Sequence, residues 1–231
     1  MIVAVTGLDR EARVIARPEI ITVVGGGDRY TLEMRIRNAL DAGARRVLSI
    51  GICGGLSPTL RVGDCVVATE IVAGSERLAT DVEWTRELAA KVPAARLGVL
   101  AGSDAIVFDR IARRRLHDET SAVAVDMESH IAARIAFEHS LPFAALRIVS
   151  DSHRQALPPA ALVAMLPDGR IDVRAVLRSL ALKPTQIPTL IRTAWEAEKA
   201  FQALSRCRHV LTPPAPVSVT PAPGELARDV A

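Results

Sequence analysis

The most constraining feature of the sequence is a regular alternation of short apolar runs with segments of helical spacing. Runs of strand length occupy residues 2–6, 20–24, 47–50, 65–72, 97–101, 122–125 and 143–149. Between them, helical spacing recurs, as in the stretch that contains Leu32, Ile36 and Leu40. Such alternation is typical of strand–helix–strand units. We therefore predict a single α/β domain with a central, mostly parallel, twisted mixed sheet flanked by helices.

The strand pattern ends after Pro158 and Pro159, and two helical segments follow at residues 171–182 and 187–204. The last residues are rich in proline, valine and threonine without periodicity, which is typical of a disordered tail. We predict an α/β domain over residues 1–168, basic amphipathic C-terminal helices over 169–209, and a disordered tail over 210–231.

Composition excludes several classes of protein. A net charge of +3 with only 3% aromatic residues does not favour nucleic-acid binding. The three cysteines have no metal-ligand spacing, and their odd number argues against a disulfide framework. The first residues lack the features of a secretory signal, and no run reaches the roughly 20 apolar residues of a membrane span. We expect a cytoplasmic protein with no metal and no organic cofactor.

Polar or glycine-rich residues follow five of the predicted strands, at the end where open α/β sheets bind ligands. These segments are residues 8–11, 51–55, 102–105, 126–128 and 147–151. In the fourth, a carboxylate could accept hydrogen bonds from a vicinal diol while Met127 covers the apolar face of a sugar. The alternative is that Asp126 and Glu128 cap the following helix.

The glycines in residues 51–55 fit neither the G-x-G-x-x-G dinucleotide fingerprint nor a P-loop. Gly54 and Gly55 could let the backbone approach a ligand closely, although turn glycines are the simpler interpretation. Arg147 lies inside an apolar strand, where an unpaired charge would be costly. A partner carboxylate is therefore expected, with Glu11, Glu128 and Asp151 as candidates.

Four segments resemble the nucleoside phosphorylase and methylthioadenosine/S-adenosylhomocysteine nucleosidase superfamily. They are GICGGLSPTLRVGD at 51–64, SD at 103–104, VDME at 125–128 and RIVSD at 147–151. Three further segments, at 126–130, 157–159 and 167–172, resemble its hopanoid-associated phosphorylase, or adenosylhopane nucleosidase, subgroup. The resemblance implies removal of adenine from adenosylhopane, which would leave ribosyl- or phosphoribosylhopane.

The resemblance also implies roles for individual residues. Asp151 would hydrogen-bond purine N7 and the 6-amino group and protonate N7, and Glu128 would hold the ribose hydroxyls with Met127 against the sugar. Glu11 would be the general base that activates water, and Arg147 would orient that water. Ile106 and Val107 would line the purine slot, and the remaining substrate-binding residues would be Leu8, Ile52, Cys53, Gly54, Asp126 and Ser150.

The sequence departs from relatives at three positions that bear on the reaction. Ile106 replaces an aromatic residue of many nucleosidases, Ile52 replaces a serine, and Ser49 replaces the phosphate-binding arginine of phosphorylases. The presence of Glu11 and the absence of that arginine favour water over phosphate as the nucleophile. Phosphate would be a co-substrate if the protein is a phosphorylase.

Two other functions remain open. The same site could act on methylthioadenosine, S-adenosylhomocysteine or another purine nucleoside, or the protein could bind a nucleoside without catalysis. The resemblance implies a homodimer. The segment from Arg170 to Arg208 has eight basic and three acidic residues and apolar residues at helical spacing, which predicts peripheral contact with the inner membrane surface. The alternative is that these helices pack on the sheet.

Overall fold

The computed structural model describes residues 1–92, 94–162 and 172–211. The proposed boundary at residues 168–169, most of the 167–172 segment and nearly all of the predicted tail lie outside these residues. Every predicted apolar run forms a strand, and one short strand, β5, is additional. The strands are β1 (Ile2–Thr6), β2 (Ile20–Val24), β3 (Arg46–Gly55), β4 (Cys65–Ala73), β5 (Glu76–Ala79), β6 (Arg96–Gly102), β7 (Ala124–Asp126) and β8 (Phe143–Asp151).

Helices occupy most of the connections between strands, as predicted. They are α1 (Asp9–Ile15), α2 (Arg29–Asp41), α3 (Val82–Lys91), α4 (Arg110–Thr120), α5 (Ser129–Glu138), α6 (Pro159–Leu162), α7 (Val173–Leu182) and α8 (Ile187–Cys207). Short 3₁₀ turns lie at Pro184–Gln186 and Arg208–Leu211.

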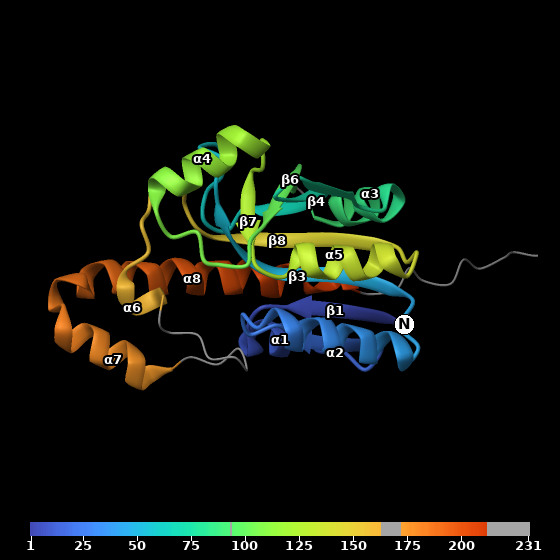
Figure 1. Ribbon diagram of the computed structural model, residues 1–231, viewed down its shortest axis with the longest axis horizontal. Coiled ribbons are helices and arrows are strands. Elements are labelled where there is room, and N and C mark those ends of the chain that lie inside the picture. Colours follow the sequence, from blue (N-terminus) through green and yellow to red (C-terminus); the bar gives the residue numbers. More distant parts are fainter. Residues whose placement is uncertain (93, 163–171, 212–231) are drawn as a thin grey trace, which may run out of the picture.

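The strands form one mixed sheet, which confirms the predicted α/β fold. Parallel strands run in the order β2-β1-β3-β8. β8 pairs with β4 in antiparallel orientation, and β4, β6 and β7 continue in parallel. β7 then returns to the end of β3 through Gly54 and Gly55. β3, β8, β4, β6 and β7 therefore close into a ring, and this closure places the residues after β7 beside the end of β3 (Figure 1).

Two hydrophobic cores cover the two faces of the sheet. One contains Leu32 and Ile36 of α2 together with Ile131 and Ile135 of α5. The other contains residues of α1 and α3 together with the last third of α8, where Leu204 is fully buried. Apolar residues alternate between these cores along β3 and β8, as expected for strands buried on both faces.

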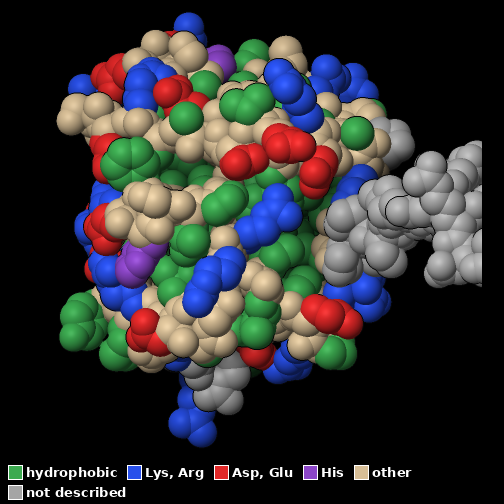
Figure 2. All heavy atoms as spheres, turned by 90° about the vertical axis from the view of Figure 1, so that its right-hand side faces the viewer, with side chains coloured by type: hydrophobic (Ala, Val, Ile, Leu, Met, Phe, Trp, Pro, Cys, Tyr) green, Lys and Arg blue, Asp and Glu red, His purple; other side chains and the backbone are tan. Residues whose placement is uncertain are grey.

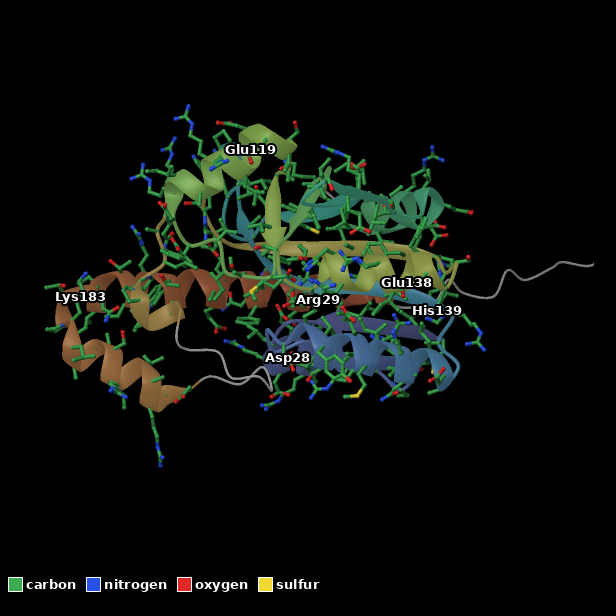
Figure 3. The ribbon with its side chains drawn as sticks, in the orientation of Figure 1. Asp28, Arg29, Glu119, Glu138, His139 and Lys183 are labelled. Atoms are coloured by element: carbon green, nitrogen blue, oxygen red, sulfur yellow. The ribbon has the colours of Figure 1, made fainter. Side chains whose placement is uncertain are left out.

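The two C-terminal helices are placed differently. The last third of α8 packs against the sheet, as the alternative interpretation predicted. In contrast, α7 has no buried residue and extends beyond the edge of the sheet (Figure 1). Lys183, in the turn between the two helices, lies far from the sheet (Figure 3).

β3 is longer than expected, because it continues through the glycines to Gly55 instead of ending at Ile50. The glycines are not turn residues but allow charged side chains to approach the strand. A Cβ atom on Gly51 would lie 2.6 Å from Glu11 Oε1 and 2.7 Å from Arg147 Nη1. Any side chain at this position would displace two buried charged groups.

Candidate functional site

A cavity of about 190 Å³ opens at the carboxyl ends of β1, β3, β7 and β8. The structure brings every residue of the predicted site to this cavity except Arg147, which lies behind its wall. Five lining residues were not predicted: Gly7, Ala105, Arg113, Val125 and Leu157. The complete lining is Gly7, Leu8, Glu11, Ile52, Cys53, Gly54, Ala105, Ile106, Val107, Arg113, Val125, Asp126, Met127, Glu128, Ser150, Asp151 and Leu157.

Glu11 lies in the first turn of α1 and is almost fully buried. Its Oε2 accepts hydrogen bonds from the backbone N–H groups of Gly7 (2.7 Å) and Leu8 (2.8 Å), and Oε1 accepts one from Ile52 (2.7 Å). Burial raises the pKa of Glu11, while Arg147 and these N–H groups oppose the rise. A carboxylate has about four acceptor positions, so Glu11 keeps capacity toward the cavity.

Arg147 is fully buried in β8 and joins the carboxylates behind the cavity. Its Nε lies 2.5 Å from Asp126 Oδ2, and its Nη2 lies 3.3 Å from Glu128 Oε2. Nη2 also donates to Ser49 Oγ at 2.6 Å. Ser49 thus holds the arginine that comes from the neighbouring strand.

Of the three carboxylates expected near Arg147, the structure places Glu128 in direct contact with it. Glu11 also interacts electrostatically with Arg147, which lowers the pKa of the Glu11 carboxyl and so opposes the effect of burial. The direct partner that was not expected is Asp126. Asp151 instead pairs with Arg113.

The two carboxylates after β7 perform different tasks. Asp126 Oδ1 accepts the backbone N–H of Ser129 at 3.0 Å, and so satisfies the start of α5. Glu128 makes no such capping bond and borders the cavity. Burial, opposed by Arg147 and assisted by Asp126, raises the pKa of Glu128 to about 8.

Asp151 lies at the end of β8, where Ser150 Oγ approaches its Oδ1 at 2.7 Å. Its Oδ2 forms an ion pair with Arg113 Nη1 but accepts no hydrogen bond from the described residues. Sequence reasoning missed Arg113 because it is one of several arginines in a helix predicted only to be basic. A usable signal is that Arg113 lies three residues before Leu116, on the half-buried face of α4.

In the cluster behind the cavity, acidic side chains outnumber basic ones. Three carboxyl groups, of Glu11, Asp126 and Glu128, surround the single guanidinium of Arg147. The raised pKa values of Glu11 and Glu128 show that the cluster favours retention of protons. Such a cluster suits a neutral or cationic group and disfavours an anion such as phosphate. Cys53 adds no charge, because burial raises the pKa of its thiol.

Carboxylates with shifted pKa values around a small cavity at the strand ends of an α/β sheet are typical of an enzyme acting on a small molecule. Comparison with known sequences identifies the family. The chain belongs to the Phosphorylase superfamily, whose sequence model matches residues 31–181.

The chain is also similar to curated 5'-methylthioadenosine/S-adenosylhomocysteine nucleosidases. The protein of Marinomonas sp. (strain MWYL1) is 28% identical over 131 residues, which cover 46% of this chain and 55% of that protein. The protein of Mycobacterium tuberculosis (strain CDC 1551 / Oshkosh) is 25% identical over 152 residues, which cover 47% and 60%. The chain thus spans somewhat over half the length of the curated relatives it matches.

Solved structures share the fold over nearly the whole chain. A futalosine hydrolase mutant of Helicobacter pylori has a TM-score of 0.65 at 15% identity, with 91% of this chain and 97% of that chain covered. The 5'-methylthioadenosine/S-adenosylhomocysteine nucleosidase of S. pneumoniae has a TM-score of 0.62 at 13% identity, with 91% and 99% covered. At these identities the likeness concerns the fold.

The described part of the chain has neither a metal-ligand cluster nor a membrane-spanning helix. No three His, Cys, Asp or Glu side chains there are grouped so as to hold a metal ion. None of its helices combines the length and apolar character needed to cross a membrane.

Proposed function

We propose that this protein is a purine nucleosidase, which uses water to cleave the N-glycosidic bond. The observation that carries the proposal is that Glu11, Glu128 and Asp151 come from three separate elements and border one cavity. The curated relatives, which are nucleosidases, support the same activity.

Each carboxylate has a task in this reaction. Glu11 accepts the proton of the attacking water, for which a raised pKa is favourable. Glu128 holds the ribose hydroxyls, and its ionised form stabilises the positive charge that develops on the sugar in the transition state. Met127 covers the sugar, and Asp151 binds the purine. Arg147 keeps Asp126 and Glu128 in position and does not touch the substrate.

Water is preferred over phosphate because of the charge at the cavity. The guanidinium of Arg147 already contacts Asp126, Glu128 and Ser49 Oγ. A phosphate dianion at this position would face Glu11 and Glu128, which repel it where they are ionised.

We further propose adenosylhopane as the substrate, on the strength of the resemblance to the hopanoid-associated subgroup. The cavity, at about 190 Å³, is below the roughly 300–1,000 Å³ usual for ligand pockets, so a large 5' substituent must extend outside it. The exposed apolar residues Leu177, Leu182 and Trp195 on α7 and α8 offer a surface for contact with a membrane that holds such a lipid. A homodimer is proposed on the resemblance alone.

A second candidate, methylthioadenosine or S-adenosylhomocysteine, is favoured by the names of the curated relatives. Adenine release measured by liquid chromatography separates the candidates when adenosine, methylthioadenosine, S-adenosylhomocysteine and a detergent-dispersed adenosylhopane are compared. The proposal predicts the highest kcat/KM for adenosylhopane. Preference for methylthioadenosine would establish the second candidate, and no adenine release from any substrate would refute nucleosidase activity.

A further inference from the structure

Arg113 is the one buried residue of α4, whose neighbouring arginines Arg114 and Arg115 point into solvent. Its position is held by two backbone carbonyl groups. Nε donates to the carbonyl oxygen of Val107 at 2.8 Å, and Nη1 donates to that of Ser152 at 3.0 Å. Burying a guanidinium is costly, so this placement calls for a role beyond the stability of the helix.

The remaining nitrogen of Arg113, Nη2, lies near the oxygen of Asp151 that Nη1 contacts. Nη2 has no hydrogen-bond acceptor among the described residues, and Asp151 Oδ2 has the ion pair with Nη1 but no regular hydrogen bond from them. Both atoms lie 3.4 Å from the point where a Cβ atom of Gly54 would be, and all three residues line the cavity. Because Gly54 has no side chain, Arg113 Nη2 and the solvent-shielded Asp151 Oδ2 border the same small space beside the strand.

An adjacent donor and acceptor match one edge of adenine. Adenine presents N7, an acceptor, next to its 6-amino group, a donor. A 6-oxopurine presents two acceptors on the same edge, and its O6 would face the Asp151 carboxylate. We propose that Arg113 is a specificity-determining residue that donates from Nη2 to purine N7 while Asp151 accepts from the 6-amino group.

This inference rests on the proposed nucleosidase function and changes one detail of it. As the anionic member of an ion pair, Asp151 acts as an acceptor, so the positive charge at N7 comes from Arg113. The departing adenine, which carries developing negative charge, is stabilised by that guanidinium. The site therefore selects 6-aminopurines.

The test is a binding measurement by calorimetry with the free bases adenine, 7-deazaadenine and hypoxanthine, which requires no turnover. 7-Deazaadenine lacks the N7 acceptor and keeps the 6-amino group. Wild-type protein should bind adenine about 10- to 100-fold more tightly than 7-deazaadenine, the range of one charged hydrogen bond. It should also prefer adenine over hypoxanthine.

In Arg113→Met the difference between adenine and 7-deazaadenine should fall to about 2-fold or less, the level left without that bond. Arg113→Lys keeps a positive charge beside Asp151 but has no second nitrogen to reach N7, so the difference should fall there as well if the Met variant does not fold. Arg114→Met, on the exposed face of the same helix, is the matched control and should retain the wild-type difference.

A merely structural Arg113 would weaken both bases equally and leave their ratio unchanged, which would overturn the inference. In that case N7 would be recognised by Asp151 itself. Failure of wild-type protein to bind any of the three bases would instead remove the purine site and, with it, the proposed function.

Discussion

At the scale of single residues, the site contains two buried arginines that pair with different numbers of carboxylates. Arg147 contacts Asp126 and Glu128, whereas Arg113 contacts Asp151. Because each buried cation needs a partner, these pairs determine which carboxylate oxygens remain for a ligand. Asp126 is paired with Arg147 and Ser129, and the Asp151 oxygen paired with Arg113 accepts no regular hydrogen bond from the described residues.

Glu128 leads to a prediction about stability. Burial raises its pKa from 4.5 to about 8, so between these values the folded protein holds a proton that the unfolded chain has released. The contribution of Glu128 to the free energy of unfolding therefore falls as pH rises from about 4.5 to about 8, and then levels off. Glu128→Gln cannot ionise and should lack this fall.

Denaturant unfolding of the wild type and Glu128→Gln from pH 4 to pH 9 measures the effect. The difference in unfolding free energy, wild type minus variant, should decline across this window. Glu138→Gln, at a partly exposed position on α5, is the control and should follow the wild type. Parallel curves for the wild type and Glu128→Gln would show that folding does not raise the pKa of Glu128.

Sequence reasoning reached most of the cavity residues because strand ends are recognisable from local pattern. It did not reach Arg113, because nothing in a run of arginines shows which one turns inward. It also predicted Asp151 as a candidate partner of Arg147, whereas the structure pairs Asp151 with Arg113. The pairing depends on which strands are neighbours and on the side from which α4 covers the cavity, and both are long-range properties.

At the scale of elements, the alternation of apolar runs predicted all strands except β5. That strand, Glu76–Ala79, contributes only Leu78 to the core, so it has no apolar run to detect. A local signal exists in Gly74, whose positive φ of 60° is the kind of backbone that a tight hairpin turn requires. The extension of β3 through its glycines was missed because glycine normally ends a strand pattern.

The helices α7 and α8 lead to a prediction about membrane contact. Val173, Leu177, Ile191 and Trp195 are more than half exposed, and basic side chains lie on the same helices. Each basic residue near an anionic leaflet contributes about 1 kcal/mol of binding free energy, which salt reduces. Wild-type protein should therefore bind phosphatidylserine-containing vesicles in a salt-sensitive way. The variant that tests this reverses Arg174, Arg178 and Arg192 to glutamate.

Vesicle co-sedimentation measures the binding, and adenine release from adenosine confirms that the site is intact. The triple reversal should lose vesicle binding and keep activity on adenosine. The matched control reverses three exposed arginines elsewhere, Arg86, Arg96 and Arg114, and should still bind. Absence of vesicle binding in the wild type, or a change of oligomeric state in the triple reversal, would assign this surface to protein contacts.

At the scale of the whole molecule, closure of the strand ring gathers the site at one end of the sheet. The return of β7 to β3 brings Glu128 beside the segment that contacts Glu11. This closure was not predictable from local sequence, because it depends on pairing between distant segments.

The end of the molecule on the right in Figure 1 has acidic and basic side chains interspersed (Figure 2).

The measurement that tests the central claim most directly is the product formed from adenosine with and without phosphate. Water as nucleophile predicts near-equal rates of adenine release in both buffers and free ribose as the sugar product. Glu11→Gln should lower kcat by about 10²- to 10⁴-fold in both buffers, the usual effect of removing a general base, while adenine binding persists. Strict dependence on phosphate with ribose 1-phosphate as product would contradict the account.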